Sequence, residues 1–351
     1  MQRALRLARA RKGLTHPNPT VGCVIVKDGK IISEANHEKA GALHAEAKAL
    51  EIAGERARGS TVYVTLEPCN HFGRTPPCTE ALIKAGVKRV VIATLDPNPI
   101  VCGKGVNRLK EAGIEIEIGV CESEARELNE DFFTYITQKR PYITLKWAQS
   151  VDGSLATKSG QSKWISSEKA RAFTNTLRAQ ASAILVGSGT VIKDDPRLTV
   201  REIKLPRQPL RVVIDRSGRL NGSERIFQEE GKVLVFTQRD VNLSARSAEI
   251  CYMENITLRG VLEELRKREV MHVFVEGGPR TLSWFLKDGL FDRIFVVIAP
   301  KIIGEGLRLG GFFSLELEKA IKLRTRRVHT LGEDVAIELV KIPSHESRDG
   351  F

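Results

Sequence analysis

The sequence predicts an α/β protein of two domains, and three observations carry this prediction. The chain has 351 residues, more than one domain of ordinary size needs. Short apolar runs rich in Val and Ile alternate with helical patterns along most of its length, as in sheets covered by helices. The segment 138–141 (QKRP) interrupts this alternation, so we place the boundary there and expect domains at 1–139 and 140–351.

The first domain is predicted to begin with a helix over 4–13 and a hairpin. The hairpin strands flank Asp28 and Gly29, a pair typical of a two-residue turn. A helix over 44–54 follows, with Gly54 as its stop. The remaining elements are expected to be a strand at 60–68, a helix at 79–86, strands at 88–95 and 114–120, and one helix at 122–136.

The second domain is predicted to continue the alternation of strands and helices, and it shows no internal repeat of the first. Buried strands of parallel sheets read as short runs of Val, Ile and Leu. Runs of this kind predict strands at 142–148, 183–187, 211–215, 233–237, 272–278, 293–299 and 335–342.

Composition sets wider bounds on function. The net charge of +12 favours anionic partners such as phosphates or nucleic acid, although a solvated basic surface is the commoner reason for such a charge. No apolar run is long enough to span a membrane, and no secretion signal heads the chain. The six cysteines are scattered rather than arranged as a disulfide framework, which indicates a reducing cytoplasm.

The most informative motif is a His-Ala-Glu triplet followed by two Pro-Cys pairs. His44, Cys69 and Cys78 can supply three zinc ligands, which leaves the fourth tetrahedral position for water, as in catalytic sites. Glu46 is placed to move protons between that water and a substrate, the role of the non-ligand Glu in nucleobase deaminases. The alternative is three unrelated buried residues.

The expected elements bring these residues together. Residues two apart on an α-helix point about 200° away from each other, so His44 and Glu46 can share a cavity only in the first turn. Cys69 is expected in the loop after the preceding strand. Cys78 is expected just before the next helix, where the helix dipole favours a thiolate.

Residues 1–139 resemble the cytidine-deaminase-like superfamily, and the long spacing between Cys69 and Cys78 narrows the resemblance. Together with HPNPTVGCVIV at 16–26 and DPNP at 96–99, this spacing resembles the bifunctional riboflavin-biosynthesis deaminase/reductases. The second half supports the same resemblance through the segments KWAQSVDG, SKWIS, DDPRLTVR and VFVEGGPRTL.

This resemblance implies a three-layer α/β/α deaminase domain and a dihydrofolate-reductase-like α/β domain. It implies zinc-dependent deamination of 2,5-diamino-6-(5-phosphoribosylamino)pyrimidin-4-one to 5-amino-6-(5-phosphoribosylamino)uracil. NADPH would then reduce the ribosyl group to ribityl. The resemblance also implies phosphorylated pyrimidines as partners, no nucleic acid or membrane, and a homo-oligomer (a dimer or tetramer).

By the same resemblance, deaminase substrate contacts are assigned to Asn18, His37, Asn70, His71, Arg74, Asp96 and Asn98. Prolines on both sides of Asn18, and between Asp96 and Asn98, restrict the backbone at these positions. Ordinary turn chemistry is the alternative, because Asn, Asp and Pro dominate turns. His16 is expected to be structural rather than a ligand.

The second domain has no GxGxxG after its first strand, so the standard dinucleotide fingerprint is absent. The glycine-rich segments 186–190 and 276–281 each follow a strand and are candidates for binding phosphate, although such turns are also plain topology. The resemblance assigns cofactor contacts to Ala148, Trp164, Thr190, Asp194, Arg216, Gly277, Gly278, Pro279, Arg280 and Thr281. It assigns substrate contacts to Ser162, Arg178, Asp194, Leu198, Arg201 and Glu276.

The same resemblance implies individual roles within this set. Arg216 is a candidate for the 2′-phosphate of NADPH, because guanidinium groups bind phosphate bidentately; its alternative is a surface arginine. Arg178 and Arg201 are expected to hold the ribose 5-phosphate. Trp164 and Ala148 are expected to line the nicotinamide pocket, the alternative for Trp164 being a place in the core.

Three other interpretations stay open. A deaminase acting on nucleic acid would share the zinc motif and suit the basic charge, but the long cysteine spacing and the second α/β domain oppose it. A zinc-stabilised scaffold would need a fourth protein ligand, for which the sequence offers no well-placed candidate. One half could also be inactive, although both halves carry intact motifs.

Overall fold

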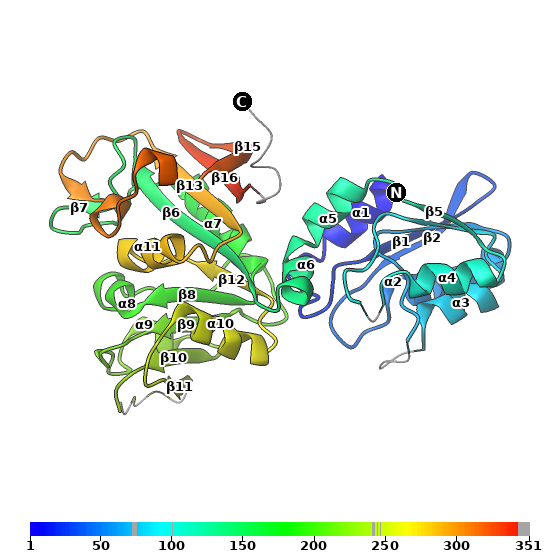
Figure 1. Cartoon of the computed structure of the whole chain (residues 1–351), viewed down its shortest axis with the longest axis horizontal. Coiled ribbons are helices and arrows are strands. Elements are labelled where there is room, and N and C mark those ends of the chain that lie inside the picture. The colour runs from blue at the N-terminus through cyan, green and yellow to red at the C-terminus, as the bar shows by residue number, and fades with distance from the viewer. Residues whose placement is uncertain (72–75, 100, 241–242, 244, 246, 343–351) are drawn as a thin grey trace. The chain divides into compact units, whose positions relative to one another are not determined.

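The computed structural model describes residues 1–71, 76–99, 101–240, 243, 245 and 247–342. The chain forms two compact units, Met1–Arg140 and Pro141–Phe351 (Figure 1). Within the described ranges, none of the helices combines the length and the apolar character that crossing a membrane requires. Both units are α/β, as the alternation of apolar runs predicts.

The first unit is built on a five-stranded sheet in the order β2-β1-β3-β4-β5. The predicted hairpin is confirmed: β1 and β2 are antiparallel, and Asp28 and Gly29 form the turn with φ of 49° and 74°. The strands β3, β4 and β5 run parallel, so their carboxyl ends meet at one edge of the sheet. The bounds are β1 Gly22–Lys27, β2 Lys30–Asn36, β3 Thr61–Val64, β4 Arg89–Ile92 and β5 Glu115–Ile118.

Helices cover both faces of this sheet and make the three layers (Figure 1). One face carries α1 and α5, and the other carries α2, α3 and α4. The helix α1 lies so close to β1 that a Cβ on Gly22 would be 2.1 Å from the carbonyl oxygen of Ala4. The bounds are α1 Gln2–Arg9, α2 Ala45–Ala53, α3 Cys78–Lys84, α4 Lys104–Glu111 and α5 Glu122–Leu128.

The single helix predicted over 122–136 is wrong, because the structure breaks it at Asn129. The helix α5 ends at Leu128, and α6 spans Glu130–Thr137. The side chain of Asn129 accepts a hydrogen bond from the backbone N–H of Thr20 at 2.7 Å and donates one to its carbonyl at 2.9 Å. This pairing with a distant loop fixes Asn129 outside helical geometry, and apolar periodicity carries no signal for it.

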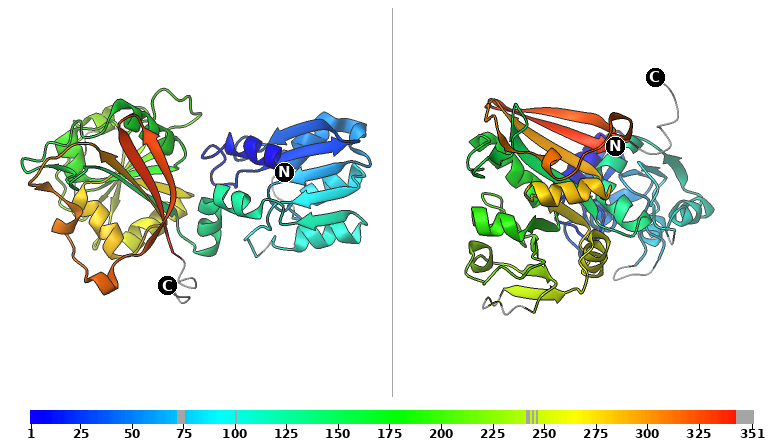
Figure 2. Two further views of the ribbon diagram at one scale, coloured as in Figure 1. Left: turned by 90° about the horizontal axis from the view of Figure 1, so that it is seen from above. Right: turned by 60° about the vertical axis from the view of Figure 1, so that its left-hand side comes forward.

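The second unit contains a nine-stranded sheet in the order β11-β10-β9-β8-β12-β6-β13-β16-β15. The strands from β11 to β13 are parallel, and β16 and β15 add an antiparallel hairpin at one edge, coloured red in Figure 2. The bounds are β6 Tyr142–Ser150, β8 Ala183–Gly187, β9 Leu210–Ile214, β10 Val233–Thr237, β11 Ala248–Tyr252, β12 His272–Val275, β13 Arg293–Ala299, β15 Leu323–Leu331 and β16 Asp334–Lys341.

Apolar side chains alternate between the two faces of this sheet, and each set packs against its own helices. In β8, Leu185 belongs to the core under α10 and α11, whereas Ile184 and Val186 belong to the core beside α8 and α9. Two further strands, β7 Ala156–Thr157 and β14 Gly306–Leu307, form a separate small pair. The helices are α7 Glu168–Ala179, α8 Ser188–Asp194, α9 Arg225–Gln228, α10 Leu258–Lys267 and α11 Pro279–Lys287.

The sequence patterns missed β11 and β15. Both are edge strands with few buried side chains, and β15 (LRTRRVHTL) consists mostly of polar and charged residues. A strand of this kind is fixed by pairing with its neighbour rather than by burial of its own side chains. The predicted strand at 60–68 is also too long, because β3 ends at Val64 and the following residues enter the loop that carries Cys69.

Candidate active sites

The side chains of His44, Cys69 and Cys78 meet at the carboxyl edge of the first sheet. Their ligand atoms all lie within 4.8 Å of one another. His44 is the N-cap of α2, Cys69 lies in the loop after β3, and Cys78 is the first residue of α3. The expected grouping is confirmed, with Cys78 starting its helix rather than preceding it.

The donor set fits a tetrahedral zinc ion. His44 Nδ1 is 3.3 Å from Cys78 Sγ and 3.5 Å from Cys69 Sγ. Zinc bonds to sulfur and nitrogen of about 2.3 and 2.0 Å at tetrahedral angles place these donor atoms about 3.5 Å apart. Hydrogen bonding with the Cys78 thiol and with His44 lowers the pKa of the Cys69 thiol, and the same contact with Cys69, together with burial, raises the pKa of the Cys78 thiol.

Glu46 borders this donor set in the first turn of α2, where its proximity to His44 was expected. Its side chain is buried, with 4% of the residue exposed. Burial, reinforced by the charge of Cys69, raises the pKa of Glu46 to about 7. A carboxyl group with this pKa exchanges protons in both directions near neutrality.

Two of the predicted substrate contacts form a chain of contacts that ends at the metal donors. Asn18 Nδ2 lies 3.1 Å from His37 Nε2, and His37 Nδ1 lies 3.1 Å from the carbonyl oxygen of Leu43. The rings of His37 and His44 meet edge to face at 5.5 Å. His16 Nε2 lies 3.0 Å from the Asp131 carboxylate, and both residues are buried.

Asp96 reaches the same edge of the sheet from the end of β4. It is 8% exposed, and burial raises its pKa to about 6. Its loop is held by Glu67, a buried residue that the sequence did not single out. The Glu67 carboxylate accepts hydrogen bonds from the backbone N–H groups of Asp96, Gly103 and Val106 at 3.3, 3.0 and 3.1 Å.

The other predicted deaminase contacts differ in their surroundings. Asn70 accepts a hydrogen bond from the Thr79 hydroxyl at 2.8 Å, and His71 is exposed. The backbone N–H of Asn98 donates to the Asp96 carboxylate at 2.8 Å. Arg74 lies outside the described residues.

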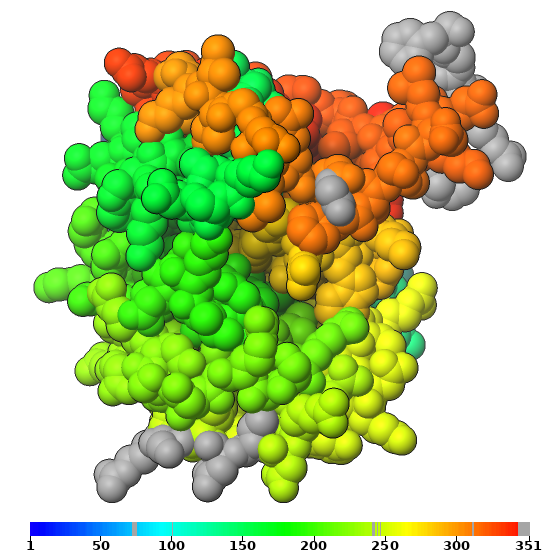
Figure 3. Space-filling model, turned by 90° about the vertical axis from the view of Figure 1, so that its left-hand side faces the viewer, coloured from blue at the N-terminus to red at the C-terminus, as the bar shows by residue number. Residues whose placement is uncertain are grey.

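The second unit contains a cavity of about 1220 Å³ at the carboxyl ends of β8, β9 and β12. Figure 3 shows a hollow in this face, bordered by green, yellow and orange segments. The cavity is lined by every residue that the sequence assigned to the cofactor or to the reducible substrate. The fold therefore brings the predicted residues, from β6 through α11, into one cavity. Their individual roles stay predictions.

The two predicted phosphate-binding turns contact each other on the floor of this cavity. The Thr190 hydroxyl accepts a hydrogen bond from the backbone N–H of Gly278 at 3.1 Å. A Cβ on Gly187 would be 2.7 Å from Thr281 Oγ1, so any larger residue there would have to displace the Thr281 side chain. Pro279 occupies the first turn of α11, whose free N–H groups open toward the cavity.

A buried ion pair crosses the cavity between α7 and the end of β12. Arg178 donates to the Glu276 carboxylate through Nε at 2.5 Å and Nη2 at 2.9 Å. Burial alone would raise the pKa of Glu276, but Arg178 and Lys146 outweigh it and lower that pKa. Lys146, which the sequence did not single out, has its own pKa lowered by burial.

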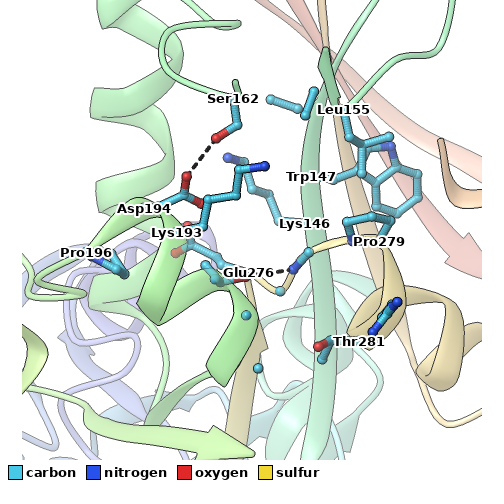
Figure 4. Close-up of a pocket in the computed structure, with 18 of the residues that line it drawn as sticks. Lys146, Trp147, Leu155, Ser162, Lys193, Asp194, Pro196, Glu276, Pro279 and Thr281 are labelled. Carbon is cyan, nitrogen blue, oxygen red and sulfur yellow. Dashed lines mark hydrogen bonds between the residues drawn. The ribbon is translucent and has the colours of Figure 1, made fainter. Parts of the chain in front are cut away.

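Ser162 and Asp194 also line this cavity. The Ser162 hydroxyl donates to Asp194 Oδ1 at 2.9 Å, and Lys146 and Lys193 project into the space beside them (Figure 4). Asp194 lies one turn after Thr190 in α8. A core position for Trp164 is excluded, because the residue is 65% exposed and its ring is stacked on Arg171 at 4.3 Å.

The remaining predicted contacts differ in their exposure and in their partners. Leu198 is buried, and Arg201 is exposed. Arg280 lies 5.7 Å from the ring centroid of Phe312. Arg216 is stacked on Trp284 at 4.2 Å and donates to the carbonyl oxygen of Ile256 at 3.2 Å, so part of its guanidinium is already engaged.

The sites and folds define a zinc-type deaminase unit followed by a separate reductase-type unit. Comparison with known families agrees. Residues 1–94 match the family described as the cytidine and deoxycytidylate deaminase zinc-binding region. Residues 141–337 match the RibD C-terminal domain.

Relatives match over nearly the whole chain. The riboflavin biosynthesis protein RibD of Aquifex aeolicus is 55% identical over 342 residues, 96% of each chain. That of Escherichia coli is 43% identical, over 97% of this chain and 98% of its own. A Thermotoga maritima crystal structure named as a diaminohydroxyphosphoribosylaminopyrimidine deaminase/5-amino-6-(5-phosphoribosylamino)uracil reductase has a TM-score of 0.92 at 41% identity, over 97% of both chains. The chain belongs to the RibD family of bifunctional riboflavin-biosynthesis enzymes.

Proposed function

We propose that this chain catalyses two successive steps on one phosphorylated pyrimidine. The first unit removes the 2-amino group of 2,5-diamino-6-(5-phosphoribosylamino)pyrimidin-4-one as ammonia. The second unit reduces the ribosyl group of the resulting uracil derivative to ribityl. The observation that carries the proposal is the metal donor set beside buried Glu46, in the same chain as the interlocked glycine turns of the large cavity.

In the first unit, His44, Cys69 and Cys78 would hold the zinc ion. Zinc, when bound, acts as a Lewis acid that lowers the pKa of a bound water to roughly 7. Glu46 takes a proton from the water that attacks the amino-bearing carbon. It then delivers that proton to the ring nitrogen. It next takes the proton of the new C–OH group and passes it to the amino group, so that the C–N bond breaks, ammonia leaves and the carbonyl forms.

The residues around this centre would orient the pyrimidine. Asn18 and His37 are already in hydrogen-bond contact beside the donors, and the backbone N–H of Asp96 is bound to Glu67 in the loop after β4. Neutral and charged hydrogen-bonding groups of this kind can bind the edge of a pyrimidine. The remaining proposed contacts are Asn70, His71, Arg74 and Asn98.

In the second unit, NADPH, when bound, supplies the hydride. The glycine turns and the N-terminus of α11 would bind its phosphates, with Ala148 and Trp164 beside the nicotinamide. Arg201 and Arg178 would hold the ribose 5-phosphate. Arg178 already donates to Glu276, so Arg201 offers the more available guanidinium. Ser162, Asp194, Leu198 and Glu276 would line the rest of the substrate site.

The substitution Glu46→Gln tests the deaminase assignment. The amide keeps the size of the side chain but cannot carry the proton, so we expect a loss of ammonia release of about a hundredfold or more. Zinc content, measured by atomic absorption, should stay at one ion per chain because Glu46 is not a ligand. Ammonia release close to that of the unchanged protein would refute the role of Glu46.

A nucleic-acid deaminase is the competing function, and the free pyrimidine phosphate and tRNA distinguish the two as substrates. We expect ammonia only from the pyrimidine phosphate.

All six cysteines are free, which supports a reducing compartment such as the cytoplasm. Assembly into dimers or tetramers stays a prediction, testable by light scattering.

A further inference from the structure

We infer that Arg219, rather than Arg216 alone, sets the preference of the second unit for a 2′-phosphorylated dinucleotide. The inference rests on the proposed reductase function and names a specificity-determining residue for it. Arg219 lines the cavity, in the loop after β9, and was not singled out by the sequence patterns.

The order of strands places this loop where the adenosine end of the cofactor must lie. Ala148, which we propose lies beside the nicotinamide, is on β6, and the glycine turns follow β12 and β8. The strand β9 is the next one outward from β8. A dinucleotide whose phosphates lie on the two glycine turns therefore extends its adenosine ribose toward the residues that follow β9.

The loop holds Arg219 firmly while leaving its guanidinium accessible. The Asp215 carboxylate accepts a hydrogen bond from the backbone N–H of Leu220 at 3.0 Å, and Leu220 is buried in the core. Arg219 itself has a side chain that is 53% exposed. On the other side, the backbone N–H of Gly218 donates to the carbonyl oxygen of Asp215 at 3.2 Å, and Arg219 lines the cavity.

The guanidinium of Arg219 lies directly beside one of the glycine turns. Its Nη2 donates to the Ser188 hydroxyl at 2.8 Å and lies 3.9 Å from the position that a Cβ on Gly189 would occupy. Its Nε is 4.0 Å from Asp215, beyond a normal hydrogen bond. Most of its five N–H donors therefore remain available to a phosphate.

Arg216 is placed differently. One face of its guanidinium is covered by Trp284, and one N–H is donated to Ile256. A stacked guanidinium of this kind suits contact with the adenine ring through its open face. A phosphate that needs a fork of free donors is better served by Arg219.

Binding of adenosine 2′,5′-bisphosphate and of 5′-AMP to the full chain tests this inference, because the two ligands differ only in the 2′-phosphate. Isothermal titration calorimetry should show that Arg219→Gln weakens binding of the bisphosphate by about tenfold to a hundredfold. Binding of 5′-AMP should be nearly unchanged. Arg219→Lys should keep part of the discrimination, since it retains the charge but not the fork.

Arg197→Gln is the matched control, because Arg197 is 47% exposed, pairs with Glu229 at 3.1 Å and does not line the cavity. It should leave the affinities for both ligands unchanged. Equal weakening of both ligands by Arg219→Gln would overturn the inference. So would full discrimination in Arg219→Gln combined with its loss in Arg216→Gln.

A parallel measurement separates this inference from the proposed function. The unchanged protein is supplied with NADPH and the deaminated pyrimidine phosphate, and NADPH oxidation is followed. Its failure would remove the reductase assignment. Normal oxidation together with unaltered ligand discrimination in Arg219→Gln would remove only the role of Arg219.

Discussion

The ion pair between Arg178 and Glu276 shows how single residues link the stability of the second unit to its site. Both side chains are mostly buried, 16% and 11% exposed. A buried carboxylate is stable only with a compensating charge, and here Arg178 and Lys146 supply it. The cavity therefore holds a fixed charge arrangement before any ligand binds.

This arrangement predicts that Glu276→Gln lowers the free energy of unfolding by an amount that depends on pH. The pKa of Glu276 is lowered in the folded state, so its stabilising contribution is present above the ordinary pKa of about 4.3 and is lost as the pH falls through the lowered value. We expect the substitution to lower the free energy of unfolding by roughly 2 kcal/mol or more at pH 7. The difference from the unchanged protein should shrink below about pH 4.

Urea denaturation at pH 7 and at low pH measures this difference. Glu305→Gln is a suitable control, because the Lys158–Glu305 pair is highly exposed and should contribute little. An unfolding cost for Glu276→Gln that is equal at both pH values would contradict the assigned charge state.

At the scale of elements, α4 positions the loop that carries Cys69. A Cβ on Gly105 would be 2.1 Å from the carbonyl oxygen of Pro68 and 3.2 Å from Glu67 Oε1. This close approach lets Glu67 accept the N–H groups at the start of the helix. The helix, the buried carboxylate and the metal loop therefore form one packed assembly.

Gly105→Ala should disturb the metal centre from a distance. Because Pro68 must move to admit the methyl group, we expect a loss of stability of about 1–3 kcal/mol and a lower zinc content. Thermal denaturation and metal analysis measure the two effects. Asn107→Ala on the exposed side of the same helix should change neither, and an unaltered zinc content in Gly105→Ala would show that the contact is not required.

Sequence patterns predicted the elements with buried apolar faces and the motif that carries the metal. They also found the hairpin, because Asp28 and Gly29 adopt positive φ values that such turns require. They missed β15 and the break at Asn129, where pairing with distant residues decides the structure. Glu67, Lys146 and Arg219 were missed for the same reason. Each interacts with a residue that is distant in the sequence and that only folding brings near.

At the scale of the whole molecule, each of the two compact units carries its own site. The metal donors all come from the first unit, and the cavity is lined by the second alone. Each proposed reaction therefore depends on residues of one unit, and a substitution in one site should leave the chemistry of the other intact.

One assay tests the central claim most directly. It measures ammonia release and NADPH oxidation separately in the same reaction. With the diaminopyrimidine phosphate, the unchanged protein should release ammonia and then oxidise NADPH, whereas Glu46→Gln should do neither. Supplying the deaminated compound should restore NADPH oxidation in Glu46→Gln. NADPH oxidation by this variant from the diaminopyrimidine itself, or none from the deaminated compound, would contradict two successive reactions on separate sites of one chain.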